Sequence, residues 1–337
     1  MVSLNMGKRI LVCGAGSIGT RHITNLLKLG ADVSVWRSRH ELLADISQQF
    51  PVRIYAELPA AIEEAEAVVV ATATDQHMSI AQQALKSRRA LFIEKPLSHN
   101  WTGIDDLRQL AENAIVEIGC QFRAHPNLKA LASMLGREEY GRTLAYRLAM
   151  GHRLDAWRPS QNYQQGYSAD SARGGGALFD LIHQIDVALW LFGPVVAVNA
   201  VLAKVGDLSI QGDDIANLLL THKSGVVGHI QLDMVSPVYR CEAEVMTSKY
   251  LFRWLYKEGI LCQLSPESEA IVDRLPERFE RNDLFLTHMA HFLGRVEGST
   301  LPALCPLEDG VAALKVALCA REASALGKTV RMEEVYQ

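Results

Sequence analysis

Short apolar runs alternate with stretches of helical periodicity over the first third of the chain. An apolar run of four or five residues is typical of a buried strand, and apolar positions three or four residues apart are typical of an amphipathic helix. The predicted strands are residues 9–13, 32–36, 52–55, 67–71, 89–93 and 116–119, and the predicted helices are residues 18–29, 58–65, 76–87 and 102–113. This alternation predicts an α/β fold with a doubly wound parallel sheet.

The pattern changes after residue 123. A linking helix is expected over residues 126–135, and apolar and polar residues then alternate over Leu144–Met150, as in a half-buried strand. Further strands are expected at residues 195–203, 215–222, 226–232, 240–247, 250–256 and 261–264, and helices at about 284–297 and 307–326. The sequence therefore predicts two domains: the doubly wound domain over residues 1–123, and an α+β domain with a mainly antiparallel, open sheet over residues 124–337.

Residues 174–193 combine three glycines with a strongly apolar helical pattern. One helix is predicted through to Gly193 by the spacing of its apolar residues, namely Leu178, Leu181, Ile182, Ile185, Leu189 and Phe192. Asp180, His183 and Asp186 follow at intervals of three, so they are expected on one face of that helix. An acid and an imidazole on a mostly apolar helix indicate a site, although a core histidine beside a helix-face aspartate would give the same pattern.

A Gly-x-Gly-x-x-Gly motif stands between the first predicted strand and the first predicted helix. In this position the first glycine makes the turn, the second lets a pyrophosphate approach the backbone, and the third lets helix and strand pack closely. The phosphates would lie on free amides at the helix N-terminus. The motif predicts a Rossmann dinucleotide site, the alternative being a glycine-rich turn in another parallel fold. Its expected cofactor-binding residues are Gly14, Gly16, Ser17, Ile18 and Gly19.

The residues after the second strand bear on which dinucleotide binds. An NAD site usually carries an acid there for the ribose 2′-hydroxyl. This chain has Arg37, Ser38 and Arg39 instead, with no acid before Glu41. Two guanidinium groups and a hydroxyl suit a 2′-phosphate. We therefore expect NADP as the cofactor, with NAD as the alternative if the two arginines are simply solvated.

Ligands of a doubly wound sheet bind beyond the carboxyl ends of its strands. We expect the residues that follow these strand ends to lie near the cofactor: Thr72, Thr74, His77, Lys95 and Arg123. For His77, a place at the start of a helix without any role in binding is an equal alternative.

Composition argues against several classes of protein. The 337-residue chain has a formal net charge of -4 with Lys and Arg spread along it, which argues against nucleic acid as a partner. No apolar run approaches the roughly 18 residues of a membrane span, and the N-terminus leads straight into a strand, unlike a signal peptide. None of the six cysteines forms a Cys-x-x-Cys pair, so we expect buried thiols of a cytoplasmic protein, and no metal ligand set is visible.

Glu94-Lys95-Pro96 follows the fifth predicted strand. Together with the phosphate loop and the glycine-Asp-His helix, this motif resembles the Gfo/Idh/MocA family, whose founding members are glucose-fructose oxidoreductase, inositol dehydrogenase and a rhizopine catabolism protein. The resemblance implies oxidation or reduction of a sugar-like alcohol with a nicotinamide cofactor. It also implies a homodimer or homotetramer, formed when the open sheet of the second domain packs against another subunit.

The resemblance further implies roles for single residues. Lys95 would be catalytic, His183 its proton-transfer partner and Asp180 the supporting acid. Glu94 and Lys95 would also contact the cofactor, and the Lys95–Pro96 peptide bond is expected to be cis. The family commonly places the aspartate four residues before the histidine, whereas the interval here is three, so Gln184 and Asp186 could share the role of Asp180.

Residues 152–173 show no clear periodicity, and a loop of this length is usually functional or disordered. Aromatic faces pack on sugar rings, and arginines bind phosphates or carboxylates. The expected substrate-binding residues are Arg123, Trp157, Arg158, Tyr163, Tyr167 and Asp186. The alternative is a lid that holds subunits together. The loop resembles that of family members found among genes for nonulosonic acids and surface sugars, which implies a nucleotide sugar or an acidic sugar as substrate.

Oxidising a secondary alcohol needs a hydride acceptor, a base for the hydroxyl proton and a cation near the developing alkoxide. The nicotinamide would be the acceptor, His183 can take the proton near neutral pH, and Lys95 can stabilise the oxyanion or relay that proton. Two rival functions stay open: a cofactor-binding regulator without catalysis, which would not need both Lys95 and His183, and an NAD-dependent hydrolase of the same family.

Overall fold

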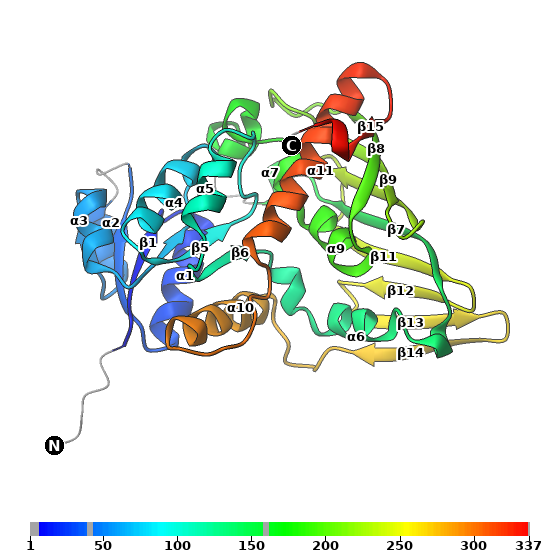
Figure 1. The fold of residues 1–337 in the computed structure, drawn as a ribbon, viewed down its shortest axis with the longest axis horizontal. Helices are drawn as coiled ribbons and strands as arrows, with labels where there is room; N and C mark the ends of the chain where they lie inside the picture. Colours follow the sequence, from blue (N-terminus) through cyan, green and yellow to red (C-terminus); the bar gives the residue numbers. More distant parts are fainter. Residues whose placement is uncertain (1–6, 39–42, 158–161, 336–337) are drawn as a thin grey trace. The chain divides into compact units, whose positions relative to one another are not determined.

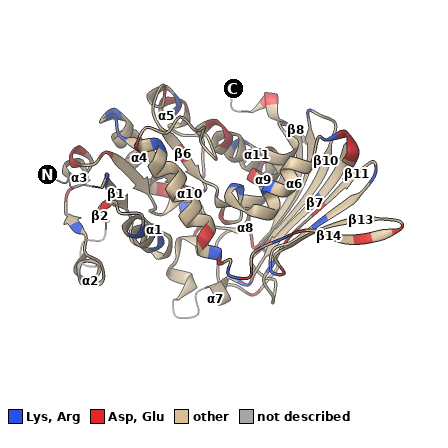
Figure 2. Cartoon of the chain, turned by 90° about the horizontal axis from the view of Figure 1, so that it is seen from below, with Lys and Arg blue, Asp and Glu red and all other residues tan. Residues whose placement is uncertain are grey.

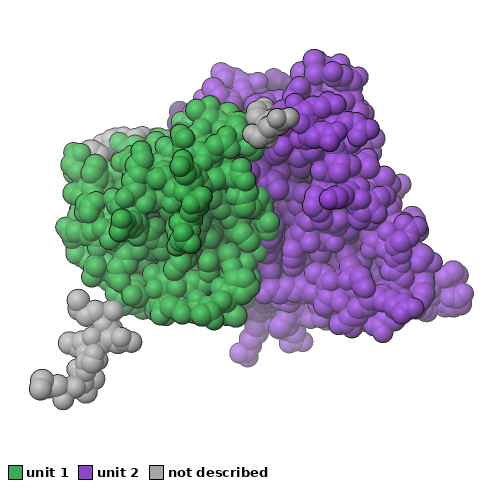
Figure 3. Space-filling model, in the orientation of Figure 1, with its two compact units in different colours: residues 1–121, 280–310 green, residues 122–279, 311–337 purple. Residues whose placement is uncertain are grey.

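The computed structural model describes residues 7–38, 43–157 and 162–335, and the chain divides into two compact units (Figure 3). Unit 1 comprises residues 1–121 and 280–310, and unit 2 comprises residues 122–279 and 311–337. The first boundary lies two residues from the predicted one. The predicted second domain is corrected in one respect, because residues 280–310 belong to unit 1.

Unit 1 is built on a six-stranded parallel sheet with the order β3-β2-β1-β4-β5-β6 (Figure 1). Its strands are β1 Arg9–Cys13, β2 Asp32–Trp36, β3 Arg53–Tyr55, β4 Ala67–Val70, β5 Ala90–Glu94 and β6 Val116–Gly119. Cys13 pairs with both Trp36 and Val70, and Val70 pairs with Ile93, so these strands end level. The residues that follow them therefore share one edge of the sheet, where ligands of this fold bind.

The helices of unit 1 pack on the sheet through apolar faces. They are α1 Ser17–Lys28, α2 Leu43–Gln49, α3 Leu58–Glu64, α4 His77–Lys86, α5 Ile104–Leu110 and α10 Arg281–Val296. Ile23 and Leu26 of α1 are fully buried in the core with Phe92 of β5. α10 comes from the far end of the sequence, lies beside α1 (Figure 1) and adds Phe292 to the same core.

Polar contacts help to hold α10 in unit 1, and the apolar pattern of the sequence could not predict them. Glu117 of β6 is fully buried. Its carboxylate accepts hydrogen bonds from His288 (2.9 Å) and Arg295 (3.1 Å) of α10 and from the backbone N–H of Leu304 (3.0 Å). Burial acts to raise the pKa of Glu117, but the hydrogen bond and charge of His288 hold that pKa below its usual value. A buried carboxylate requires such partners, and residues 280–310 supply them.

Unit 2 contains a nine-stranded sheet with the order β14-β13-β12-β11-β7-β10-β9-β8-β15. The strands are β7 Thr143–Gly151, β8 Val195–Ala203, β9 Ile215–His222, β10 Val227–Asp233, β11 Arg240–Thr247, β12 Leu251–Leu255, β13 Ile260–Ser265, β14 Ser268–Arg274 and β15 Val330–Arg331. β7 and β10 pair in parallel and the other neighbours are antiparallel, which confirms the predicted mainly antiparallel sheet. The apolar pattern did not predict β14, because this edge strand is mostly exposed.

Helices cover one face of this sheet. They are α6 Pro126–Met134, α8 Ala177–Asp180, α9 His183–Phe192 and α11 Leu307–Leu326. The short helix α7 Leu154–Trp157 belongs to the loop between β7 and α8. α8 packs on β9 and β10, α9 on β7, and α6 on β12 to β14. The opposite face is open, as predicted: Leu219, Val227 and Met246 on it are 58%, 51% and 50% exposed.

The single helix predicted over residues 174–193 is wrong. α8 ends at Asp180, α9 begins at His183, and the segments 171–180 and 183–192 are bent by 51°. Leu181 and Ile182, which join them, are buried, as are Leu178 and Ile185 on either side. Because the chain is buried all round at this point, apolar spacing continues through the bend and gives no sign of it.

Three observations concern expectations from composition. All six cysteines are buried and none forms a disulfide, as predicted. Over the described ranges, Lys and Arg are interspersed with Asp and Glu on the elements of both units (Figure 2). No single helix in those ranges is long and apolar enough to cross a membrane, and only the bent pair within residues 171–192 passes that test, by length and composition.

Candidate functional site

The phosphate loop assigns a different role to each of its glycines. Gly14 has a φ of +99°, and a Cβ there would lie 2.6 Å from the carbonyl oxygen of Ala71. A Cβ on Gly19 would lie 2.0 Å from the carbonyl oxygen of Gly14. At Gly16 no atom comes within 4 Å of such a Cβ. Packing thus requires the first and third glycines, while the second faces open space that suits a pyrophosphate.

The start of α1 also suits an anion. Gly16 is its N-cap, no side chain caps the first turn, and that turn holds no acidic residue. The amide of Thr20 donates to the carbonyl of Gly16 (2.8 Å), and the N–H groups before it have no partner within the helix. Ser17 is exposed there. Backbone donors at the positive end of a helix dipole fit the phosphates of a dinucleotide.

The residues expected to select the cofactor lie at the same edge of the sheet. Gly14 donates its N–H to the carbonyl of Trp36 (2.8 Å), which joins the phosphate loop to the end of β2. Arg37 and Ser38 follow directly, partly exposed and exposed respectively. Arg39 lies outside the described residues. In sheets of this kind the end of the second strand is where the adenosine ribose is held.

The end of β4 carries three further candidates. The hydroxyl of Thr72 is buried and has no hydrogen-bond partner in the described part of the chain, so it can serve a ligand at this edge. Thr74 is buried in the 3-10 turn before α4. His77 is 1% exposed, and its ring nitrogens face the carbonyl oxygens of Pro96 (2.9 Å) and Thr72 (3.2 Å). Both ring nitrogens of His77 therefore contact backbone carbonyl groups of the protein.

Glu94, Lys95 and Pro96 form the turn that follows β5. The Lys95–Pro96 peptide bond is cis, as expected. Lys95 is partly exposed, whereas Glu94 is buried and its carboxylate lies 2.7 Å from Nε2 of His22. Burial acts to raise the pKa of Glu94, but the hydrogen bond and charge of His22 hold that pKa below its usual value. Glu94 is thus an anion held within unit 1.

Asp180 and His183 belong to unit 2 and lie on consecutive helices. The Oδ1 atom of Asp180 accepts a 2.7 Å hydrogen bond from the hydroxyl of Tyr167. The ring of His183 packs against that of Phe122, with 5.1 Å between centroids. Both residues are nearly buried, at 3% and 6% exposure. Tyr167, expected as a substrate contact, is therefore seen orienting Asp180.

Arg123 and Asp186, two other expected substrate contacts, bind one another. Nε of Arg123 donates to both carboxylate oxygens of Asp186 at 3.1 Å, and Nη2 donates to Oδ1 at 2.7 Å. Their side chains are only 5% and 1% exposed. This bidentate pair joins the start of unit 2 to α9, and it gives both residues a structural role that the sequence did not predict.

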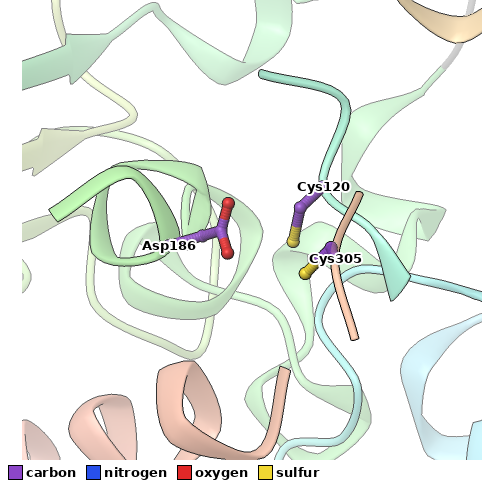
Figure 4. A group of neighbouring side chains, drawn as sticks. All are labelled: Cys120, Asp186 and Cys305. Atoms are coloured by element: carbon purple, nitrogen blue, oxygen red, sulfur yellow. The ribbon is translucent and has the colours of Figure 1, made fainter. Parts of the chain in front are cut away.

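Figure 4 draws Asp186 together with two thiols that belong to unit 1. The sulfur atoms of Cys120 and Cys305 lie within 4.8 Å of each other, and the carbonyl of Cys305 accepts the N–H of Ile118 at the end of β6. Both thiols are buried and neither forms a disulfide. Asp186 already binds Arg123 within unit 2, and both cysteines belong to unit 1. We therefore assign no metal to these three side chains.

The remaining candidates lie in the loop before α8. The indole N–H of Trp157 donates to the carbonyl of His152 (2.8 Å). The hydroxyl of Tyr163 accepts the N–H of Ser209 (3.1 Å), and this hydrogen bond lowers the pKa of Tyr163. Arg158 lies outside the described residues. Trp157 and Tyr163 are partly exposed, which keeps them as candidate sugar contacts.

His22 is the residue that the sequence analysis missed. Its position contained a signal, because His22 stands four residues after Ile18 and four before Leu26 on the apolar face of α1. A polar residue on a buried helix face needs a buried partner. Glu94 is that partner.

Comparison with known proteins gives two family matches. Residues 8–122 match the model described as an oxidoreductase family with an NAD-binding Rossmann fold. Residues 128–253 match the model of the GFO/IDH/MocA C-terminal domain. Together the two matches span well over half of the chain.

Similar proteins and structures agree with these matches. The chain is 26% identical over 347 residues to myo-inositol 2-dehydrogenase of Thermotoga maritima, covering 97% of this chain and 99% of that protein. It is 26% identical over 229 residues to UDP-N-acetylglucosamine 3-dehydrogenase of Acidithiobacillus ferrooxidans, covering 66% of each. The crystal structure of a probable dehydrogenase from Thermotoga maritima superposes with a TM-score of 0.81 at 25% identity, covering 97% of this chain and 100% of that one.

Proposed function

The chain belongs to the Gfo/Idh/MocA family of oxidoreductases, and we propose that it transfers a hydride between a nicotinamide cofactor and a secondary alcohol of a sugar or nucleotide sugar. One observation carries the proposal. The phosphate loop and the turn that bears Lys95 follow strands that end level at one edge of the same sheet. The names of the relatives, an inositol dehydrogenase and a nucleotide-sugar dehydrogenase, support a ring alcohol as substrate.

The residues of the phosphate loop would hold the dinucleotide, and the bound nicotinamide supplies the chemistry of hydride transfer. In the direction of alcohol oxidation, His183 takes the hydroxyl proton as general base. The ammonium group of Lys95 stabilises the negative charge that develops on the alcohol oxygen, or relays its proton. Asp180, held by the hydroxyl of Tyr167, supports the imidazolium that forms at His183.

We propose NADP as the preferred cofactor. Arg37 and Ser38 follow β2 at the edge where the ribose is held, and this edge has no acid before Glu41. A guanidinium group pairs well with a phosphate. Thr72 offers a hydroxyl to the cofactor at the neighbouring strand end.

We propose that the loop of residues 152–173 recognises the substrate, with Trp157 and Tyr163 stacking on the sugar ring. A guanidinium group at Arg158 would bind an acidic or phosphorylated substituent. A nucleotide sugar or acidic sugar of surface-sugar or nonulosonic acid metabolism is the substrate class that this loop suggests. The enzyme would act in the cytoplasm, where such activated sugars and NADP are found.

We further propose that the open face of the unit 2 sheet joins subunits into a homodimer or homotetramer. Leu219, Val227 and Met246 lie on this one face, and each is half exposed or more. On the same face Arg253 pairs with Glu244 (3.2 Å), so this charge is already neutralised within the chain. A solution mass of two or four chains is expected, and a monomer at micromolar concentration would refute this arrangement.

The function is tested with a panel of sugars and nucleotide sugars, each offered with NADP and with NAD. Absorbance of the reduced cofactor reports turnover. Reduction of the cofactor by at least one ring alcohol is expected. Cofactor binding without turnover on any member of a broad panel would favour a regulator. Release of a leaving group without net cofactor reduction would favour a hydrolase.

A further inference from the structure

Two buried histidines hold the residues on either side of Lys95. His22 projects from α1 and is 1% exposed. Its Nε2 atom lies 2.7 Å from Oε1 of Glu94, and the other oxygen of that carboxylate accepts the backbone N–H of Lys95 at 3.2 Å. One carboxylate therefore connects the imidazole of His22 to the peptide group from which the Lys95 side chain extends.

His77 holds the opposite side of the same turn. Its Nδ1 atom lies 2.9 Å from the carbonyl oxygen of Pro96, and its Nε2 atom lies 3.2 Å from that of Thr72. Burial lowers the pKa of His77 although both carbonyl contacts act in the other direction, so the ring is neutral near pH 7. A neutral imidazole donates through one nitrogen only, and the shorter distance assigns the N–H to Nδ1 and hence to Pro96.

We propose that His22 and His77 are positioning residues for Lys95: together they fix the backbone of residues 94–96 and so aim the Lys95 ammonium group. The proposal rests on the catalytic role of Lys95 in the proposed function. Both rings are 1% exposed and contact groups of unit 1, and Nδ1 of His22 is buried without a hydrogen-bond partner in the described part of the chain, so neither ring is presented to substrate or cofactor. Both act through the turn and touch no reacting atom.

The arrangement also links the turn to the two strand ends beside it. His22 belongs to the helix that begins at the phosphate loop. Nε2 of His77 lies 3.2 Å from the carbonyl oxygen of Thr72, beyond the end of β4, and with the proton on Nδ1 this is a packing contact and no hydrogen bond. The atoms that hold Lys95 are thus fixed to the same elements that would hold the cofactor. A shift of either histidine would displace the ammonium group without removing it, and a displacement of about 1 Å can lower a rate about a hundredfold.

Unit 1 contains a matched pair that does not involve Lys95. His288 bonds to Glu117 through Nε2 at 2.9 Å, is also 1% exposed, and packs edge-on against Phe92, as His22 does. His288→Leu therefore removes an equivalent buried histidine from a buried carboxylate. His288 bonds to Glu117, although its charge also acts on Glu94. Its loss is expected to lower the free energy of unfolding and to affect the turn less than the loss of His22.

The test compares His22→Leu and His77→Leu with His288→Leu and with two conservative variants. Gln places its amide N near the Nε2 position of histidine, so His22→Gln should keep the bond to Glu94. Asn places its amide N near the Nδ1 position, so His77→Asn should keep the bond to Pro96. All variants are assayed well below their unfolding midpoints, for kcat, KM and the dissociation constant of reduced cofactor, and by hydrogen exchange of the peptide covering residues 91–98.

We expect each Leu variant at His22 or His77 to lower kcat at least about tenfold and to speed exchange of the turn amides, with the cofactor dissociation constant within about threefold. The conservative variants should recover most of kcat, and His288→Leu should change kcat and turn exchange less than either of the other Leu variants. If His288→Leu lowers kcat equally, or if turn exchange in both histidine variants equals that of wild type, the positioning roles are refuted. A wild type inactive on every sugar refutes the proposed function instead, and the exchange data still decide the positioning of the turn.

Discussion

Removing one partner of the Arg123–Asp186 pair should destabilise unit 2 far more than removing both. The pair is bidentate, with three N–O distances of 2.7 to 3.1 Å, and its side chains are 5% and 1% exposed. Truncating one member of such a pair leaves a buried charge without its counter-ion, which typically costs about 3–5 kcal/mol. Replacing both members with apolar residues of similar size is often neutral or stabilising.

We therefore expect Asp186→Leu and Arg123→Met each to lower the free energy of unfolding by about 3 kcal/mol or more. The double variant should lie within about 1 kcal/mol of wild type, which gives a coupling energy well above the usual error of additivity. Arg123→Lys keeps the charge but not the planar fork, so it should recover only part of the loss.

Urea unfolding measures these differences. Trp157, Trp190 and Trp254 lie in unit 2, while Trp36 and Trp101 lie in unit 1. A background with Trp36→Phe and Trp101→Phe therefore confines tryptophan fluorescence to unit 2. A loss below about 1 kcal/mol in Asp186→Leu, or a double variant as unstable as the sum of the single ones, would contradict the structural role of the pair.

Two further predictions concern pH and cofactor choice. Burial lowers the pKa of His125 to about 4, whereas the unfolded value is about 6.5. Between these pH values unfolding takes up a proton, so this contribution to the free energy of unfolding is complete above about pH 6.5. It falls by up to about 3 kcal/mol as the pH decreases toward about 4. Urea unfolding from about pH 7.5 to 4.5 should show that the free energy of unfolding depends less on pH in His125→Phe than in wild type. An unchanged pH dependence would contradict the assignment. Arg37→Asp should weaken NADP binding at least about tenfold but NAD binding less than about threefold, because the carboxylate repels a 2′-phosphate and accepts from a 2′-hydroxyl. Titration of both cofactors decides this, and equal dissociation constants in the wild type would remove the basis for NADP preference.

Much of the fold could be predicted because burial and periodicity agree along most of the chain. β1 and β2 have the predicted bounds, and their apolar residues other than Trp36 are buried. The bend between α8 and α9 could not be predicted, because residues on every side of it are buried and the apolar spacing continues through it. β14 was missed for the opposite reason: it is an exposed edge strand without an apolar face.

The candidate site could be predicted where a motif fixes backbone geometry, and less well where side chains choose their partners. Gly14, Gly16 and Gly19 have the packing that the motif predicts. By contrast, Arg123 and Asp186 stand 63 residues apart in the chain, and only folding shows that they bind each other. The same holds for the hydroxyl of Tyr167 on Asp180, since no local pattern reveals a pair formed by tertiary contact.

The central claim is that Lys95 carries the chemistry. Lys95→Met removes the ammonium group and keeps a flexible side chain of similar length. With a substrate from the sugar panel, the account predicts that the rate of cofactor reduction falls at least about a hundredfold, while the dissociation constant of the cofactor changes less than about threefold. A variant that keeps more than about a tenth of the wild-type rate, a loss below about 1.4 kcal/mol, would contradict the claim.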